Sequence, residues 1–574
     1  MPANTGAPAA VKRPHRWLRR LGRVAVGLVV IMIVCLFWFW LVVRVPEPVT
    51  STDDLALPVR SLDGNGRWRI GNNWLGKNGH GLYEVYIEGN DLQRGMTYGV
   101  LAQELIVRQE EIFVDRLRKL VPNESWLHTL KYFTAWFNRD LPEHVPLEFE
   151  REIFGVSRSF SDDYDFIGPK YHRALNYHAA HDIGHALQDL ALVGCTSFAA
   201  WDSATADGGL LIARNFDFYL GEEFAKDKLI TFVNPTGGIP FMTVSWGGFM
   251  GAASGMNTEG LTVTINAAKS ATPFGAKMPI SLLAREILEH AATIDSAIAI
   301  ASRREVFVSE SILVGSARDR RAVIIEKAPD GLDITSTGGD RLVCANHYQS
   351  DLFKDSEANT INMRKSDSMS RWKRMEALLD AEDTLDATSA VMILRDRKGP
   401  DGSDVGMGNP MSINQLIAHH GIVFQPEKRR VWVSSYPYQE GAFVCYDITT
   451  VFSRCATNSV TGPVHEEALT IAADPFLTSP AMQEHVLFAR LHSEIHDHVL
   501  AGKPYRLSTE DEAAFIASNP RSYLTFADLG DLYRSRKECA KAILFYTQAL
   551  ERTVASEAER QRITEAIAEC NPRP

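Results

Sequence analysis

The chain has 574 residues, of which 45% are apolar and 23% are charged, so it can form two or three globular units. Its formal net charge of −11 argues against a nucleic-acid-binding protein. Its seven cysteines include no Cys-x-x-Cys pair, which disfavours a zinc ribbon or a thioredoxin-like site. The sequence does not decide whether a disulfide such as Cys445–Cys455 or Cys539–Cys570 forms.

The N-terminal segment is basic and then strongly apolar. A cluster of Lys and Arg precedes residues 24–43, a run of uncharged residues long enough to cross a bilayer. Trp38 and Trp40 lie near the end of this run, where interface aromatics are found, and the positive-inside rule places the N-terminus in the cytoplasm. A cleaved signal peptide is the alternative. We predict that residues 1–45 are a basic segment and a single-pass anchor in the inner or plasma membrane, with the remainder periplasmic or extracytoplasmic.

Residues 46–194 are predicted to be a linker followed by a helix-rich portion. A strand over 82–87 precedes Arg94-Gly95-Met96-Thr97-Tyr98-Gly99, whose glycines lie four residues apart on a predicted helix. Their spacing does not fit a phosphate loop, so it favours close helix packing. Apolar periodicity predicts further helices over 101–120, 147–160 and 174–192.

His181 and His185 in the last of these helices have the i, i+4 spacing of a zinc site. Asp182 stands where a metallopeptidase has Glu, and its side chain is one methylene shorter. No third ligand is evident from the sequence. A polar helix face is the favoured interpretation, and a zinc-dependent hydrolase is an alternative.

The chemistry is concentrated around Cys195. A short apolar strand after Cys195 is followed by Asp207-Gly208-Gly209, and a second strand leads to Arg214 and Asp217. This pattern predicts a hairpin that brings Arg214 and Asp217 back beside Cys195. A neighbouring guanidinium stabilises a thiolate, so we expect Cys195 to be an activated nucleophile.

The motifs Gly-Cys-Thr-Ser at 194–197 and Arg-Asn-x-Asp at 214–217 resemble N-terminal-nucleophile (Ntn) hydrolases of the acyl-coenzyme A:isopenicillin N acyltransferase and choloylglycine hydrolase type. The resemblance implies that the precursor cuts itself between Gly194 and Cys195. Cys195 would then carry a free α-amine, whose pKa of about 7.7–8.0 suits a general base.

The segment after the hairpin is predicted to contain strands over 229–233, 241–245, 248–254 and 260–266, helices over 280–289 and 294–302, and strands over 311–315, 322–326 and 342–346. Strands over 412–419, 421–433 and 442–446 are expected to complete the core. This α+β order suits a four-layer α/β/β/α sandwich, the Ntn-hydrolase fold that the resemblance implies, with a catalytic core over 195–455.

The resemblance also assigns roles to residues beyond the hairpin. Asn346, before His347, matches an Asn whose amide donates to the oxyanion of the tetrahedral intermediate, and Asn266 is a second candidate donor. Arg371 in Asp367-Ser368-Met369-Ser370-Arg371 matches an Arg at the substrate pocket or behind the nucleophile. His347 is expected to be structural.

The C-terminal part is predicted to be a helical linker over 456–518 and one repeat similar to the tetratricopeptide (TPR) repeat over 519–574. The repeat positions are Phe526, Leu529, Gly530, Tyr533, Ala542, Tyr546 and Ala549. One repeat cannot bury a continuous core, so packing within this chain or a weak protein contact is expected.

The sequence thus predicts a membrane-anchored cysteine Ntn hydrolase or acyltransferase that cleaves or transfers the acyl group of a small-molecule amide through an acyl-Cys195 enzyme. We expect neither a metal nor a cofactor, and no nucleic-acid partner. The alternatives are an ester- or phospholipid-directed Ntn hydrolase, the zinc hydrolase, and a non-catalytic TPR scaffold.

Overall fold

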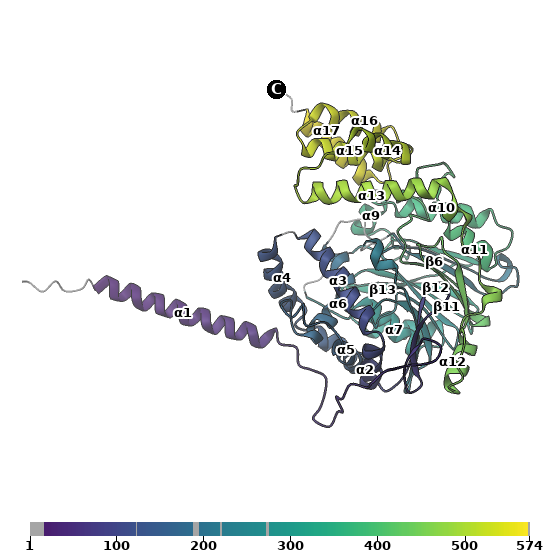
Figure 1. Ribbon diagram of the computed structural model, residues 1–574, viewed down its shortest axis with the longest axis horizontal. Coiled ribbons are helices and arrows are strands. Elements are labelled where there is room, and N and C mark those ends of the chain that lie inside the picture. The colour runs from purple at the N-terminus through teal and green to yellow at the C-terminus, as the bar shows by residue number, and fades with distance from the viewer. Residues whose placement is uncertain (1–15, 122, 188–193, 219–220, 271–274, 572–574) are drawn as a thin grey trace, which may run out of the picture.

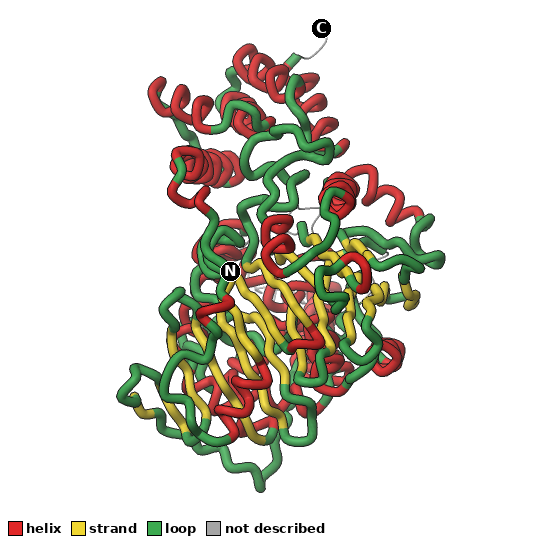
Figure 2. The backbone as a smooth tube through the Cα atoms, turned by 90° about the vertical axis from the view of Figure 1, so that its right-hand side faces the viewer, coloured by secondary structure: helices red, strands yellow, loops and turns green. Residues whose placement is uncertain are grey.

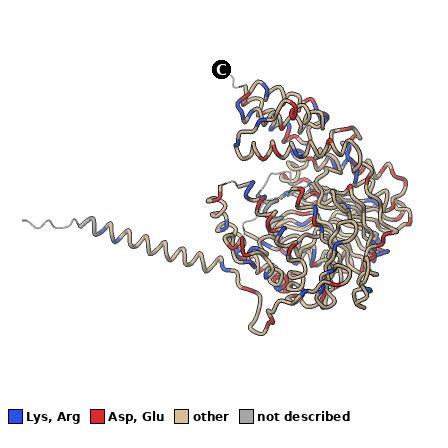
Figure 3. Tube along the Cα trace, in the orientation of Figure 1, with Lys and Arg blue, Asp and Glu red and all other residues tan. Residues whose placement is uncertain are grey.

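The computed structural model describes residues 16–121, 123–187, 194–218, 221–270 and 275–571, with side chains placed for most of these. Helix α1 (Arg16–Val42) projects away from a body of sheets and helices (Figure 1). Figure 3 shows that this helix carries basic residues near its start and none of either sign along most of its length. By length and composition residues 20–42 could cross a membrane, a test that an N-terminal signal sequence also passes.

Two sheets form the centre of the body (Figure 2). In the described residues the larger sheet has eleven strands, and β4 and β7 are its parallel pair. In spatial order they are β1 (Ser61–Leu62), β2 (Trp68–Ile70), β3 (Asn73–Lys77), β4 (Tyr83–Gly89), β7 (Leu229–Pro235), β8 (Phe241–Ser245), β9 (Ser254–Asn257), β10 (Leu261–Ala267), β11 (Glu310–Ser316), β12 (Arg321–Ala328) and β13 (Gly331–Thr335).

The smaller sheet has six strands in the described part of the chain and is antiparallel throughout. Its spatial order is β14 (Arg341–Cys344), β5 (Thr196–Ala200), β6 (Leu211–Phe216), β15 (His420–Gln425), β16 (Arg430–Ser434) and β17 (Phe443–Asp447).

Apolar side chains divide the body into four layers. One core cluster joins the inner faces of the two sheets and includes Ile212, Ile230 and Phe424. A second packs the other face of the larger sheet against helices α2 (Asp91–Leu101), α5 (Leu147–Ser157), α6 (Lys170–Leu187), α7 (Ile280–His290) and α8 (Ile294–Arg303). A third packs the smaller sheet against α10 (Ser368–Asp380) and α11 (Ala387–Leu394). The helix, sheet, sheet, helix order expected from the sequence is therefore present.

The remaining helices lie around this body. They are α3 (Gln103–Leu120), α4 (Glu124–Phe137), α9 (Glu357–Lys365), α12 (Ile448–Ala456), α13 (Pro480–Leu500), α14 (Thr509–Ser518), α15 (Tyr523–Ser535), α16 (Cys539–Leu550) and α17 (Glu557–Cys570). Helices α13 to α17 share one apolar cluster and form a helical C-terminal region at the top of Figure 1. Its similarity to a TPR repeat stays a prediction, as do the domain boundaries.

Two predicted strands were wrong. Residues 248–254 form a turn in which Gly248 has φ +82°, and the strand begins only at Ser254. Residues 412–419 form a loop because Asn414 Oδ1 accepts a hydrogen bond from the Leu416 N–H, a local contact that competes with strand pairing. The predicted strand over 421–433 is two strands, β15 and β16, which form a hairpin.

The glycines of α2 allow close packing on α5, as the sequence predicted. A Cβ atom on Gly95 would lie 2.1 Å from the main-chain oxygen of Glu152, and one on Gly99 would lie 2.8 Å from Ser159 Oγ. The same interface buries the Arg94 guanidinium against the Glu152 carboxylate. Arg285 of α7 also pairs with Glu152, with Nη2 2.6 Å from Oε2.

We predict that Gly95→Ala lowers the free energy of unfolding by about 1–3 kcal/mol, because the added methyl overpacks the α2–α5 interface. A decrease in stability would be informative, because Ala in a helix interior is otherwise more favourable than Gly by about 1 kcal/mol. Thermal denaturation of the purified chain measures the effect, with Gly64→Ala, where a Cβ meets no atom within 4 Å, as control. Equal stability of the two variants would contradict the packing argument.

Candidate functional site

The hairpin brings Cys195, Arg214 and Asp217 together. Strands β5 and β6 pair with Ser197 opposite Arg214, so Cys195, the residue before β5, lies near the end of β6. Arg214 Nη2 donates to Cys195 Sγ at 3.3 Å. The main-chain oxygen of Asp217 accepts from the Gly194 N–H at 3.2 Å, which fixes the residue before Cys195. Cys195, Arg214 and Asp217 are all buried.

The rest of the Arg214 guanidinium is fixed by the larger sheet. Nη1 donates to Ala253 O and Ser254 Oγ, both at 2.6 Å, and Nη2 also donates to Ile265 O. The guanidinium carbon lies 4.4 Å from the centroid of the Phe216 ring. Arg214 lies on the same sheet as β5, and its contacts with the opposite sheet hold a rigid positive charge against the Cys195 sulfur.

Arg371 holds the other side of Cys195. From the first turn of α10 its Nη1 donates to Cys195 O and to Thr196 Oγ1, each at 2.8 Å. Its Nη2 donates to Asn346 Oδ1 at 2.8 Å and to Asp367 Oδ1 at 2.7 Å. Since its side chain is 1% exposed, Arg371 is part of the core and positions both the start of β5 and Asn346.

Asn346 follows β14, the strand that pairs with β5. Arg371 orients the side-chain carbonyl of Asn346, and Asn346 Nδ2 donates to Ala267 O at 2.9 Å. Among the described residues this leaves the second N–H of the Asn346 amide for another acceptor. Asn266 is engaged differently: its Nδ2 donates to Cys344 O at 3.2 Å and to Ala345 O at 3.4 Å. Asn266 thus holds the chain that carries Asn346.

Gln415 was missed by the sequence reasoning, which placed it in a strand. Its Nε2 donates to Gly194 O at 3.0 Å and lies 3.4 Å from Asp217 Oδ2. A Cβ on residue 194 would lie 2.2 Å from this Nε2, so Gly at 194 is required for the contact. The sequence offered no signal for it, because the loop that carries Gln415 lies 221 residues away.

Burial dominates the electrostatics of the site. Burial raises the pKa of the Cys195 thiol, and the Arg214 guanidinium lowers it by less. The expectation of a stabilised thiolate was therefore wrong for the intact chain, because loss of water raises the thiol pKa by more than one cation lowers it. Burial also raises the pKa of Asp217 to about 7, against the opposing charges of Arg371 and Arg214.

Two histidines beside the site are neutral structural groups. His347 Nδ1 lies 2.8 Å from Ser368 Oγ, which also accepts from the Asn346 N–H, and burial lowers the pKa of His347 to about 4. His178 accepts the Met250 N–H at its Nε2, and burial lowers its pKa to about 4. The side chains of His181 and His185 lie outside the described residues, so the zinc alternative stays a hypothesis.

A large cavity adjoins these residues. Its volume is about 2890 Å³, and its lining includes Asn346, Arg371 and Gln415 together with Phe39 of α1 and Phe133 of α4. Small-molecule sites usually enclose about 300–1,000 Å³, so this space exceeds what a compact ligand fills.

Comparisons with known proteins agree with the family resemblance. Residues 204–435 match the family model described as acyl-coenzyme A:6-aminopenicillanic acid acyl-transferase, a range that contains Arg214, Asp217, Asn346 and Arg371 but begins after Cys195. An uncharacterized protein of Archaeoglobus fulgidus is 27% identical over 349 residues, which cover 54% of this chain and 56% of that protein.

The N-acylethanolamine-hydrolyzing acid amidase of Caenorhabditis elegans is 25% identical over 227 residues, 37% of this chain and 59% of the relative. The chain thus spans less than two thirds of the length of both curated relatives. A solved structure, described as the Caenorhabditis elegans N-acylethanolamine-hydrolyzing acid amidase ortholog, aligns at 18% identity with a TM-score of 0.30. The alignment covers 41% of this chain and 93% of that chain. The sequence matches support the Ntn-hydrolase resemblance.

We predict that Asp217 makes the folded state less stable as the pH rises from about 4 to about 7, by up to about 1.4 kcal/mol per pH unit. The sign follows because the folded chain binds this proton more tightly than the unfolded chain, whose carboxyl has its usual low pKa. Denaturant unfolding of Cys195→Ala and of Cys195→Ala/Asp217→Asn across this pH range measures the difference.

The second variant should lose this part of the slope. Asp330→Asn, at an exposed position, is the matched control and should keep it. Equal slopes in all three proteins would show that Asp217 is ionised throughout.

Proposed function

We propose that this protein is a membrane-anchored cysteine Ntn hydrolase or acyltransferase that acts on an acyl amide. The observation that carries the proposal is the contact set of the Gly194–Cys195 bond: Gln415 on the Gly194 carbonyl, Arg214 on the thiol and Arg371 on the Cys195 carbonyl. The family match and the amidase among the relatives support the reaction class.

The first step of the proposed mechanism is cleavage of the chain. Cys195 Sγ attacks the Gly194 carbonyl carbon, Gln415 Nε2 donates to the oxygen that becomes negative, and the thiol proton passes to the departing α-nitrogen. Asp217, with a pKa of about 7, suits the proton transfer because it exchanges a proton near neutral pH. Water then hydrolyses the Gly194 thioester, which frees the Cys195 thiol and α-amine.

The freed α-amine then serves as the base that the uncut chain lacks. With a pKa of about 7.7–8.0 it takes the thiol proton as sulfur attacks the amide carbon of the substrate. The free N–H of Asn346 Nδ2 donates to the oxyanion, and the protonated amine returns its proton to the leaving amine. Water or an acceptor amine finally removes the acyl group from Cys195.

The cavity favours substrates with an apolar acyl chain. Apolar residues make up most of the lining that comes from α1 and α4, and Trp136 of α4 stacks on Phe39 of α1 with ring centroids 6.0 Å apart. On α4, Trp126, Tyr132 and Phe133 are each more than half exposed, as expected for an interfacial helix beside an anchor. An acyl chain could thus reach the site from the lipid side, with the catalytic body extracytoplasmic.

The first prediction of this proposal concerns the chain itself. Denaturing gels with intact mass and N-terminal sequencing of the wild type should show pieces of roughly 22 and 42 kDa, by proportion to 63.9 kDa, and the larger should begin Cys-Thr-Ser. Cys195→Ala should stay whole and should not hydrolyse a long-chain N-acyl amide. A wild type that stays whole yet hydrolyses the amide, or a Cys195→Ala variant that keeps the activity, would overturn the mechanism.

The second prediction concerns Gln415. Gln415→Ala should slow the cutting of freshly synthesised chain by about 10²–10³-fold, because it removes a donor from the developing oxyanion. Pulse-labelled synthesis followed on gels measures the rate, and Gln425→Ala in β15 should cut at the wild-type rate. Unchanged cutting in Gln415→Ala would show that its contact with Gly194 is only structural.

A further inference from the structure

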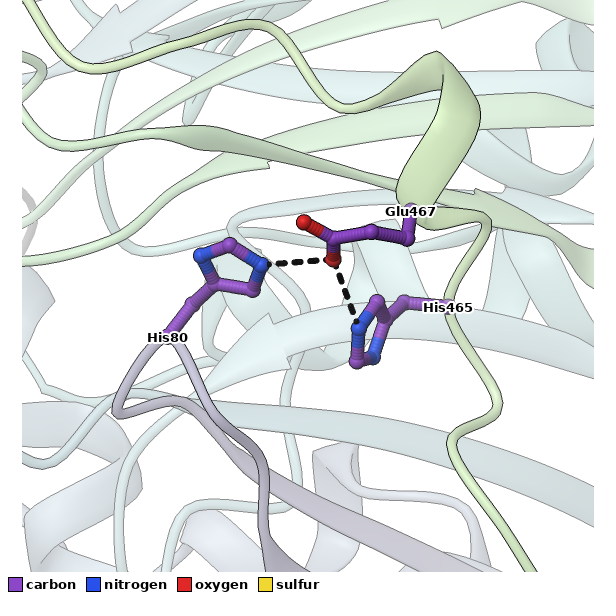
Figure 4. Close-up of side chains that lie close together, drawn as sticks. All are labelled: His80, His465 and Glu467. Carbon is purple, nitrogen blue, oxygen red and sulfur yellow. Dashed lines mark hydrogen bonds and ion pairs between the residues drawn. The ribbon is translucent and has the colours of Figure 1, made fainter.

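A cluster of two imidazoles and a carboxylate lies apart from Cys195 and is not used by the proposed mechanism. His80 comes from the turn between β3 and β4, and His465 and Glu467 come from the segment after α12 (Figure 4). His80 Nε2 lies 2.9 Å and His465 Nε2 lies 3.1 Å from the same oxygen, Glu467 Oε2. All three ligand atoms lie within 4.8 Å of one another.

We propose that His80, His465 and Glu467 bind one divalent metal ion of the zinc class. Zinc takes His nitrogen and carboxylate oxygen at about 2.0–2.2 Å in tetrahedral geometry, which places neighbouring ligand atoms about 3.3–3.5 Å apart. The observed separations from Glu467 are a few tenths of an ångström shorter, so small side-chain rotations would admit the ion. Two His and one carboxylate leave the fourth position for water.

A buried carboxylate stands behind one of these ligands. Glu84 Oε1 lies 3.6 Å from His465 Nδ1, which is buried and has no hydrogen-bond partner in the described residues. Glu84 also accepts hydrogen bonds from Asn78 Nδ2 at 2.8 Å and from the Tyr446 hydroxyl at 3.0 Å. A carboxylate behind a ligating His fixes its tautomer, so that Nδ1 carries the proton and Nε2 faces the metal.

A second cluster, Glu148, Glu289 and His290, has similar ligand spacing but different electrostatics. Arg285 Nε lies 3.3 Å and Arg94 Nη2 lies 3.9 Å from Glu289, so two guanidinium groups already neutralise its carboxylate. A metal ion there would meet fixed positive charge in a buried setting. The charge distribution therefore favours the cluster at His80 and makes the second cluster a natural control.

The proposed ion would join segments that are distant in the sequence. Arg67 Nη2 donates to Gly462 O and Arg69 Nη2 donates to Val460 O, both at 2.6 Å, so the neighbouring main chain is already held in place. His80 precedes residue 195, and the other two ligands follow it. If the chain is cut as proposed above, the ion would cross-link the two pieces; only this consequence rests on the proposed function.

Metal binding can be tested on the full detergent-solubilised chain in the Cys195→Ala background, which removes the reactive thiol and keeps the chain whole. After dialysis against a chelator, the protein is titrated with zinc chloride by calorimetry, and bound zinc is measured by mass spectrometry. The background protein should hold one more zinc than either His80→Ala or Glu467→Gln, and zinc should raise its midpoint of thermal unfolding. Glu467 is exposed, so its substitution leaves the fold intact.

Two further variants make the result specific. Glu84→Gln should weaken zinc binding by about 10–100-fold, the usual effect of removing the partner of a ligating His. His290→Ala should bind zinc as the background does. Equal zinc content in the background, His80→Ala and Glu467→Gln would overturn the proposal, as would loss of the bound zinc in His181→Ala instead. Neither result depends on whether residue 195 is a catalytic nucleophile.

Discussion

The geometry around Cys195 depends on one buried cation, Arg371. Its guanidinium joins the start of β5, the end of β14 and the first turn of α10 through Cys195 O, Asn346 Oδ1 and Asp367. A buried guanidinium is tolerated only when its donors are matched by acceptors, and removal of it would leave those acceptors without partners. Arg371 therefore fixes the position of Cys195, the proposed nucleophile, relative to the Asn346 amide that is proposed to bind the oxyanion.

The intact chain buries Cys195, the proposed nucleophile. The energetic cost of burying a thiolate exceeds the stabilisation from Arg214, so the thiol stays protonated in the intact chain. Under the proposed mechanism, cleavage supplies an amine beside the sulfur. In that mechanism the thiol is first buried and protonated and is activated only after cleavage. Asp217, whose pKa burial raises to about 7, is the group proposed to exchange the proton near neutral pH.

The portion before Cys195 is packed into the body. Strands β1 to β4 continue the larger sheet, and Glu152 on α5 pairs with Arg285 on α7, from the other side of residue 195 in sequence. A cut at 194 would therefore leave two chains that share one sheet and one core. The proposed metal ion at His80, His465 and Glu467 would add a link between these two chains at the turn before β4.

Local sequence signals were enough to predict several elements of the fold. Glycine turns and apolar alternation located the β5–β6 hairpin, and with it the approach of Arg214 to Cys195, because these depend on neighbours in sequence. The resemblance identified Asn346 and Arg371 but not what Arg371 contacts. Three further features could be seen only in the folded chain: the raised pKa of Cys195, the contact of Gln415 with Gly194 and the cluster at His80. Each depends on burial or on contacts between segments hundreds of residues apart, which local patterns do not encode.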